Sequence, residues 1–308
     1  MKLFGLLTLL VSAIIGFGQV VNKDRLNASI ATIPLIKTNT IELVDQKNAY
    51  SMPSEVQAES LLLYDIAEDE ILVQKNTNTF VPIASLSKLT TALLAVEYLP
   101  LDSVTTISSE AAERDGSSAY LIAGERLYIK DLLALMLVGS ANDAAKAIAD
   151  AVGEHLGGNT FEKRQRLFVT LMNDKSAELG MRHTFYQNPT GLDVKAYAPS
   201  NYSTASDLVL LIKEISKYPL LWELSRNNEA TVISLDHIEH KISNTNIISS
   251  DIPHYVGGKT GTTDLAGESL ILLFEHPFGH PLALMLLHAP AHTRFEDALN
   301  FLQHNNIL

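Results

Sequence analysis

The sequence predicts an α+β fold: an antiparallel sheet flanked by helices, with a helical lobe inserted between its strands. Two observations favour this fold class. Strand-like segments occupy both ends of the globular part, residues 59–76 and 230–289, and helical periodicity dominates the stretch between them. When the first and last segments of such a chain pair in one sheet, the helices between them form a separate lobe. The composition, 46% hydrophobic and 19% charged, is ordinary for a soluble globular protein.

Residues 1–18 have the features of a secretory signal peptide. One lysine is followed by an apolar run over residues 3–17, which is shorter than the roughly 20 residues that a membrane-spanning helix needs. Gly16 and Gly18 are small residues spaced as at a cleavage site, so we expect cleavage before Gln19. An uncleaved anchor and a buried helix are the alternatives.

The rest of the chain is expected to form a lead-in or tether, residues 19–57, and one domain, residues 58–308. The lead-in is only weakly periodic. Residues 59–76 predict a hairpin of two short strands around a tight turn. Residues 85–99 carry apolar side chains at helical spacing, with Ser85 at the N-cap or in the first turn.

The middle of the chain predicts three further helical regions. Residues 129–153 contain two helical segments separated by a break at 139–142, and Gly153 is expected to end the second segment. Residues 161–180 predict an amphipathic helix that ends at a glycine. The same periodicity recurs over residues 203–218.

The last part of the chain changes from helical to strand patterns. Two short segments predict a hairpin, a third predicts the start of a strand, and two apolar segments predict buried strands. In order, these segments are residues 230–235, 240–245, 257–263, 268–276 and 281–289. A helix over residues 293–305 is expected to close the fold.

The sequence Ser85-Leu86-Ser87-Lys88 places a hydroxyl and an amine on one face of a helix. Residues i and i+3 lie about one turn apart, so Ser85 and Lys88 are neighbours while Ser87 points elsewhere. A serine hydroxyl is a weak nucleophile that needs a base within hydrogen-bond reach. Lysine serves as a base only when burial or nearby positive charge lowers its pKa. Taken alone, the pattern favours a solvated N-cap serine and a surface lysine over a catalytic pair.

Two further motifs change this interpretation. Ser140-Ala141-Asn142 falls in the predicted break between helices, where two side chains two residues apart can project together. Lys259-Thr260-Gly261 begins a predicted strand and supplies a positive charge, a hydroxyl and a glycine that lets a ligand backbone approach closely. In this order, the three motifs are the signature of penicillin-binding proteins and class A β-lactamases.

The chain resembles the low-molecular-mass penicillin-binding proteins, the serine D-alanyl-D-alanine carboxypeptidases, over roughly residues 58 to 305. Beyond the three motifs, four segments look like family segments in family order: residues 123–145, 178–193, 202–208 and 257–267. The resemblance implies a penicillin-binding/β-lactamase-like fold. It also implies a D,D-peptidase catalytic domain that trims peptidoglycan stem peptides through an acyl-enzyme intermediate.

The resemblance further implies a role for each motif residue. Ser85 would form the acyl-enzyme with the penultimate D-Ala carbonyl, and Lys88 would accept its proton. Ser140 would relay a proton to the leaving amine, and Asn142 would hold the substrate amide.

At the other end of the substrate, Lys259 would provide positive potential for the terminal carboxylate. The hydroxyls of Thr260 and Thr262, on either side of Gly261, would bind that carboxylate. The backbone N–H groups of Ser85 and Thr262 would form the oxyanion hole. Such a local positive pocket reconciles an anionic substrate with a formal net charge of −12.

The expected partners follow from the same resemblance: peptidoglycan stem peptides as substrates and β-lactam antibiotics as covalent inhibitors, with no cofactor. The acidic net charge argues against nucleic acid, whose phosphates would repel it. The chain has no cysteine, which excludes disulfides and thiolate zinc sites.

Three other patterns imitate functional sites. His237 and His240 form H-x-x-H, but on a predicted hairpin their side chains fall on opposite faces, so we expect no metal there. Ser225-Arg226-Asn227 is a second S-x-N in a predicted helix-to-strand region. Glu223 imitates a deacylating glutamate but lies far along the chain from Ser140, so rapid penicillin hydrolysis is not expected.

We therefore expect an exported serine-type D-Ala-D-Ala carboxypeptidase in the periplasmic or extracytoplasmic cell-wall space. Many such family members carry a second β-rich domain and a C-terminal amphipathic anchor. This sequence shows neither, which resembles the shorter, endopeptidase-type members. A D-alanyl-D-alanine endopeptidase is thus the main alternative. A β-lactamase and an inactive wall-binding scaffold are further alternatives.

Overall fold

The computed structural model describes residues 50–194, 198 and 200–308. The predicted signal peptide and most of the predicted lead-in lie outside the described residues. Residues 50–57 have no regular secondary structure, but Val56 is buried and the N–H of Gln57 donates to the carboxylate of Asp297. The end of the predicted lead-in is therefore packed onto the domain.

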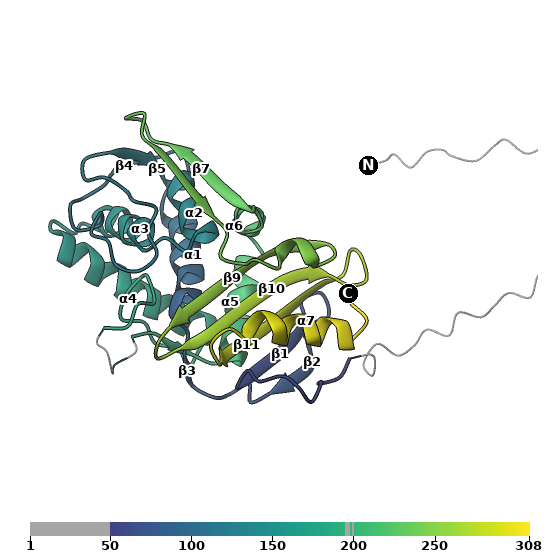
Figure 1. The fold of residues 1–308 in the computed structure, drawn as a ribbon. Coiled ribbons are helices and arrows are strands. Elements are labelled where there is room, and N and C mark those ends of the chain that lie inside the picture. Colours follow the sequence, from purple (N-terminus) through teal and green to yellow (C-terminus); the bar gives the residue numbers. More distant parts are fainter. Residues whose placement is uncertain (1–49, 195–197, 199) are drawn as a thin grey trace, which may run out of the picture. The chain divides into compact units, whose positions relative to one another are not determined.

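A five-stranded antiparallel sheet lies at the centre of the domain (Figure 1). Its strands are β1 (Ser60–Asp65), β2 (Glu70–Lys75), β9 (Tyr255–Thr263), β10 (Gly267–Glu275) and β11 (Pro281–Ala289). The order across the sheet is β2-β1-β11-β10-β9, so the first strand of the chain pairs with the last. This pairing confirms the predicted α+β arrangement, in which both ends of the domain build one sheet.

The sheet buries both of its faces because it lies between two layers. On β10, Ile271 and Leu273 face the core of the helical lobe, whereas Leu270 and Leu272 face a second core. The second core is covered by α7 (Arg294–His304), which packs on β10 and β11 (Figure 1). Burial on both faces explains why β1, β10 and β11 are apolar at most of their positions.

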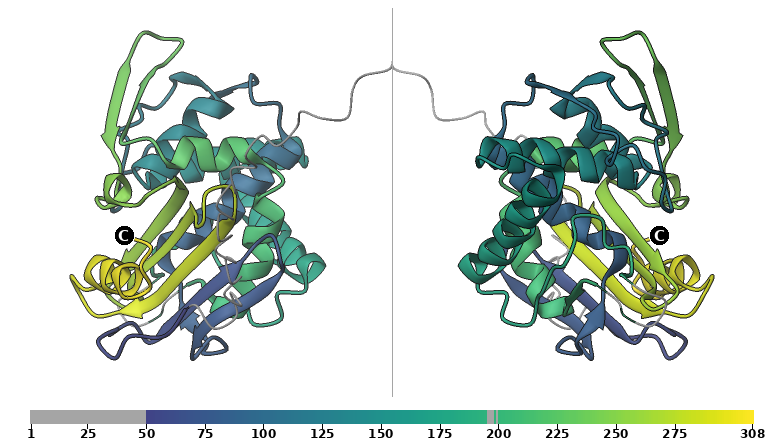
Figure 2. Two further views of the ribbon diagram at one scale, coloured as in Figure 1. Left: turned by 90° about the vertical axis from the view of Figure 1, so that its right-hand side faces the viewer. Right: turned by 90° about the vertical axis from the view of Figure 1, so that its left-hand side faces the viewer.

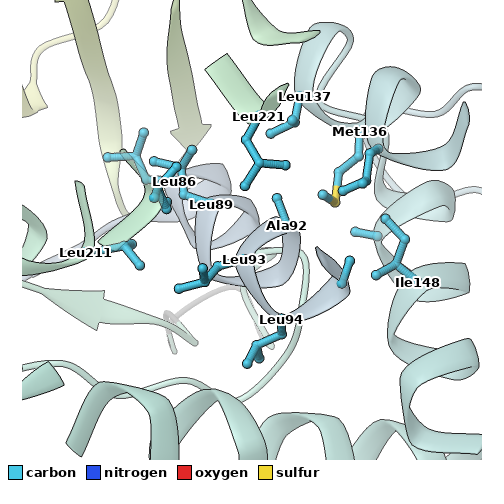
Figure 3. Packing of buried hydrophobic residues seen from close by; sticks show 14 of the residues in the cluster. Leu86, Leu89, Ala92, Leu93, Leu94, Met136, Leu137, Ile148, Leu211 and Leu221 are labelled. Carbon is cyan, nitrogen blue, oxygen red and sulfur yellow. The ribbon is translucent and has the colours of Figure 1, made fainter. Parts of the chain in front are cut away.

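The helical lobe is built around α1 (Lys88–Tyr98), which directly follows the 3-10 turn η2 (Ala84–Ser87). The other helices are α2 (Ile129–Val138), α3 (Asn142–His155), α4 (Phe161–Leu179), α5 (Ala205–Ile215) and α6 (Pro219–Ser225). Figure 3 shows Leu89, Ala92 and Leu93 of α1 among side chains from α2, α3, α5 and α6. Full burial of a leucine contributes about 1.5–3 kcal/mol, so this core fixes α1 and the turn before it.

Three small sheets and one more 3-10 turn complete the described fold. The pairs are β3 (Val81–Pro82) with β6 (Tyr202–Ser203), β4 (Val104–Thr106) with β5 (Arg126–Tyr128), and β7 (Glu229–Ile233) with β8 (Glu239–Ser243). The turn η3 (Ser249–Asp251) precedes β9. The hairpin of β7 and β8 was predicted from sequence, and Figure 2 shows it extending beyond the helical lobe.

Two local predictions were wrong, and one helix was missed. Gly153 does not end α3, which continues to His155. A Cβ at Gly153 would lie 2.4 Å from the carbonyl oxygen of Arg164, so this glycine lets α3 and α4 approach closely. The Lys259 motif lies in the second half of β9 rather than at its start. Helix α6, which has Pro219 in its first turn, was not predicted.

Candidate active site

Ser85 lies in the η2 turn directly before α1 and is half-buried. The preceding residue, Ala84, has a left-handed backbone with φ +44°. Glycines approach this turn from two sides: a Cβ on Gly191 would lie 1.8 Å from the oxygen of Ala84, and one on Gly261 would lie 2.8 Å from that of Ile83. These close approaches bring β9 beside Ser85, and the approach of a ligand backbone at Gly261 stays a prediction.

Lys88 is completely buried, and its amine has three hydrogen-bond partners. Its Nζ lies 2.8 Å from Ser85 Oγ, 2.7 Å from Asn142 Oδ1 and 2.7 Å from the carbonyl oxygen of Thr190. The carboxamide and carbonyl oxygens can only accept hydrogen bonds, so a neutral amine directs both of its N–H groups to them. Its lone pair then faces the hydroxyl of Ser85, which is the geometry of a base.

Burial also sets the protonation of the two lysines in the site. Burial, and then the positive charge of Lys259, lower the pKa of Lys88 well below its usual value, and the Asp143 carboxylate opposes this shift only in part. Burial, and then the charge of Arg294, lower the pKa of Lys259 to about 7. A depressed pKa favours the neutral amine that a proton acceptor requires.

Asn142 is the first residue of α3, and the loop before β5 holds its side chain in place. Its Nδ2 donates to the oxygen of Asp115 at 2.7 Å, which leaves Oδ1 directed at Lys88. The next residue, Asp143, is buried and accepts from the backbone N–H groups of Ala119 and Leu121, each at 3.0 Å. The loop and the start of α3 therefore form one hydrogen-bonded unit.

The carbonyl of Thr190, the third partner of Lys88, is fixed by two asparagines. Asn188 Oδ1 accepts from the N–H and the hydroxyl of Thr190, and from the N–H of Gly191. Asn201 Nδ2 donates to Ser87 Oγ at 2.8 Å and to the oxygen of Asn188 at 2.9 Å. Sequence reasoning placed this segment in the family but gave it no role. The sequence Asn188-Pro189-Thr190-Gly191 is typical of a tight turn, and it was the signal that could have pointed to this segment.

Ser140 and Lys259 form a second linked pair. Lys259 Nζ donates to Ser140 Oγ at 2.8 Å and to the oxygen of Thr260 at 2.9 Å, and all three residues are buried. Ser140 has a left-handed backbone with φ +58°, which costs roughly 1–2 kcal/mol for a residue other than glycine. This strained residue occupies the predicted break between α2 and α3.

The exposed side of the site is formed by Thr262, which receives a hydrogen bond from a residue that sequence reasoning missed. Nη1 of Arg294 donates to Thr262 Oγ1 and, at 3.1 Å, to the oxygen of Gly261. Arg294 begins α7, so only the packing of that helix on the sheet brings it here. Thr260 is buried, and its hydroxyl is bonded to that of Thr245 at 2.6 Å.

The structure brings the three motifs together through their two lysines. The site comprises Ser85, Lys88, Ser140, Asn142, Lys259, Thr260, Gly261 and Thr262. Two residues of the patterns set aside as imitations, Ser225 and His240, make hydrogen bonds within the scaffold. Ser225 Oγ accepts from the N–H of Gly258 at 3.1 Å. The ring nitrogens of His240 lie 2.9 Å from the oxygen of Ala119 and 3.0 Å from a carboxylate oxygen of Glu125.

A family model described as D-alanyl-D-alanine carboxypeptidase matches residues 46–288. The D-alanyl-D-alanine endopeptidase of Pseudomonas aeruginosa is 34% identical over 258 residues, which cover 82% of this chain and 78% of the relative. The D-alanyl-D-alanine carboxypeptidase DacF of Bacillus subtilis is 32% identical over 213 residues, which cover 67% of this chain and 51% of the relative.

Solved structures are similar to this chain as well. Penicillin-binding protein D2 of Listeria monocytogenes, in its ampicillin-bound form, is 30% identical and superimposes with a TM-score of 0.68. The comparison covers 83% of this chain and 100% of that one. The chain therefore has the fold of the penicillin-binding proteins, as the sequence predicted.

Proposed function

Because the chain belongs to the D-alanyl-D-alanine carboxypeptidase family, it is a serine-type D-Ala-D-Ala peptidase, and we propose that it acts as a carboxypeptidase on peptidoglycan stem peptides. The observation that carries the proposal is the buried amine of Lys88, 2.8 Å from Ser85 Oγ with two obligate acceptors on its other side. That arrangement supports Ser85 as the nucleophile.

Acylation begins when Ser85 Oγ attacks the carbonyl carbon of the penultimate D-Ala and its proton passes to Lys88 Nζ. The oxyanion lies between the backbone N–H groups of Ser85 and Thr262, because Gly261 lets β9 approach the η2 turn. Preorganised donors of this kind contribute about 3–4 kcal/mol each to transition-state stabilisation. Asn142 contributes by orienting Lys88, and its Nδ2 is already bonded to the chain.

Collapse of the tetrahedral intermediate breaks the peptide bond and requires a proton on the departing amine. Ser140 supplies that proton and is recharged by Lys259, to which it is hydrogen-bonded at 2.8 Å. The proton that Lys88 took from Ser85 passes through solvent to Lys259, so Lys88 is neutral again. Water then attacks the Ser85 ester; Lys88 takes the proton of the water and returns it to Ser85 Oγ as the ester bond breaks. One water is consumed, and the products are free D-Ala and a shortened stem peptide.

The leaving residue carries a carboxylate, and the site has matching cations. Lys259 and Arg294 both lie at the β9 end of the site, and Arg294 is hydrogen-bonded to Thr262. We propose that Thr260, Thr262 and these two cations bind the terminal carboxylate. The same group is present in β-lactams, and the ampicillin-bound relative supports their binding. We propose that they acylate Ser85 and so inhibit the enzyme covalently.

A D-alanyl-D-alanine endopeptidase is the second candidate function. It is favoured by the Pseudomonas relative, which bears that name and shares about four fifths of each chain's length with this protein. Endopeptidase action uses the same nucleophile and base, and differs only in the size of the group that leaves.

We further propose that residues 1–18 direct export, that residues 19–57 lead into the domain, and that the enzyme acts in the extracytoplasmic cell-wall space. The location of peptidoglycan, the proposed substrate, supports this. Among the residues that the structure describes, no helix has both the length and the apolar character needed to cross a membrane.

Two substrates separate the candidate functions: a stem pentapeptide ending in D-Ala-D-Ala, and a purified cross-linked dimer. We expect the wild-type protein to release D-Ala from the pentapeptide, and Ser85→Ala to lose this activity while Ser225→Ala keeps it. Cleavage of the dimer without release of D-Ala would overturn the carboxypeptidase proposal in favour of the endopeptidase. Turnover of neither substrate would overturn both.

A further inference from the structure

A carboxylate lies beside the cation at the substrate-carboxylate end of the site. Glu268 is directly opposite Thr262 in the pairing of β10 with β9, so the two side chains share a face of the sheet. Its Oε2 is 3.8 Å from Nε of Arg294, and each of these two side chains is only 12% exposed. The guanidinium that contacts Thr262 through Nη1 is therefore paired with a negative charge at its Nε.

This pair interacts through charge rather than through a hydrogen bond. Nε of Arg294 is buried and has no hydrogen-bond partner, because 3.8 Å is too long for one. Nη1 of Arg294 is instead held by Thr262 and the oxygen of Gly261. Neutralising Glu268 should thus change the potential at the site while these hydrogen bonds keep Arg294 in place.

The charge of Arg294 dominates at this end of the site near neutral pH. The pKa of Lys259 is lowered to about 7, so its amine carries only part of a positive charge there. Arg294 remains charged at any pH that the protein meets, even though burial lowers its pKa. The negative charge of Glu268 therefore offsets part of the attraction that an incoming carboxylate experiences.

We propose that Glu268 is a specificity-determining residue that weakens the preference of the site for a carboxylate on the leaving group. The enzyme would then also accept substrates in which that carboxyl is neutral, for example amidated. This inference rests on the proposed function, because it assigns the carboxylate end of the same site. Glu268 acts through Arg294 and takes no part in bond making.

The test compares acylation of Ser85 by benzylpenicillin, which is anionic, with acylation by its methyl ester, which is neutral. The measured quantity is the acid-to-ester ratio, which is the second-order rate constant for benzylpenicillin divided by that for its methyl ester. The fraction of active protein cancels in this ratio. The variants are Glu268→Gln, which removes the charge, and Glu268→Asp, which retains it. Glu239→Gln, at an exposed position of β8, is a matched control for the change in net charge.

We expect Glu268→Gln to raise the acid-to-ester ratio by about three- to tenfold, as one charge acting through a partly solvated site would. Glu268→Asp and Glu239→Gln should both stay close to the wild-type ratio. If Glu268→Gln does not fold, Glu268→Ser makes the same prediction. A ratio that does not change, or that falls, would overturn the proposal and leave Glu268 with a structural role.

The same experiment distinguishes failure of this inference from failure of the proposed function. Wild-type protein that is acylated at Ser85, with no selective effect of Glu268→Gln, would overturn only the inference about Glu268. Wild-type protein that is not acylated at Ser85 would overturn the proposed function and this inference with it.

Discussion

In the proposed mechanism, the chemistry of this site depends on Lys88, because its amine faces Ser85 and its other two hydrogen-bonding directions are occupied. Asn142 Oδ1 and the carbonyl oxygen of Thr190 each accept one N–H. Sequence spacing could place Ser85 and Lys88 one helical turn apart. It could not supply the two acceptors, which come from parts of the chain 54 and 102 residues away.

Lys88→Arg tests whether this residue is a base or only a positive charge. Arginine stays protonated and cannot accept the proton of Ser85. We expect acylation by benzylpenicillin to fall at least about 100-fold, the usual contribution of a general base. Stopped-flow rates would measure it, and thermal unfolding would confirm that the variant folds.

Lys175→Arg is a matched control for that substitution. Lys175 is also largely buried, and its Nζ lies 3.0 Å from carboxylate oxygens of Glu97 and Glu178. Arginine can replace it in such pairs, so acylation should be unaffected. Wild-type rates in Lys88→Arg would show that Lys88 contributes charge alone.

At the scale of elements, the position of Ser85 depends on two glycines that press on the η2 turn. Gly261 belongs to β9, and Gly191 belongs to the loop that carries the Thr190 carbonyl. Sequence analysis gave the first glycine a ligand-binding reason and did not single out the second. Such close approaches depend on which backbones meet in three dimensions, and neighbouring residues do not reveal that.

Gly191→Ala should disrupt both the turn and the site. The new Cβ would lie 1.8 Å from the oxygen of Ala84, and the backbone is left-handed with φ +83°. We expect a loss of more than about 3 kcal/mol in the free energy of unfolding, together with slower acylation. Urea denaturation and penicillin acylation would measure the two effects.

Gly157→Ala provides the comparison for Gly191→Ala. Gly157 has the same kind of backbone, with φ +85°, but a Cβ there would meet nothing within 4 Å. Its replacement should cost only the conformational strain, roughly 1–2 kcal/mol, and leave acylation unchanged. Equal losses of stability in both variants would show that the contact with Ala84 is unimportant.

At the scale of the whole molecule, the sheet and helical lobe could be predicted because each has a clear periodicity in the sequence. Both hairpins, the buried strands and the long helices follow from that periodicity. The arrangement of the site could not be derived in this way. Arg294 reaches Thr262 only because α7 packs across β10 and β11 (Figure 1). Arg294 lies far along the chain from β9, so the residues around it in the sequence do not indicate this contact.

The buried charge of Lys259 should make the stability of the whole protein depend on pH. Its pKa is lowered from 10.5 to about 7 in the folded protein, so between these values the unfolded chain binds more protons. The destabilisation caused by protonation is complete below about pH 7 and is relieved as the pH rises. Stability therefore increases with pH across this window.

Lys259→Met isolates this effect, because methionine has no charge to bury. Between about pH 8 and pH 9, the free energy of unfolding of the wild type should rise more steeply than that of the variant, by about 1 kcal/mol per pH unit. Urea denaturation at several pH values would measure both slopes. Parallel slopes would mean that Lys259 titrates at its ordinary pKa.

The most direct test of the central claim, that Ser85 is an activated nucleophile, is the intact mass of the protein after incubation with benzylpenicillin. We predict one stable added penicilloyl group in the wild type and in Ser87→Ala, and none in Ser85→Ala. Ser87 is the matched control because it lies in the same turn but donates to the oxygen of Ala84. An adduct that persists in Ser85→Ala, or its absence from the wild type, would contradict the account.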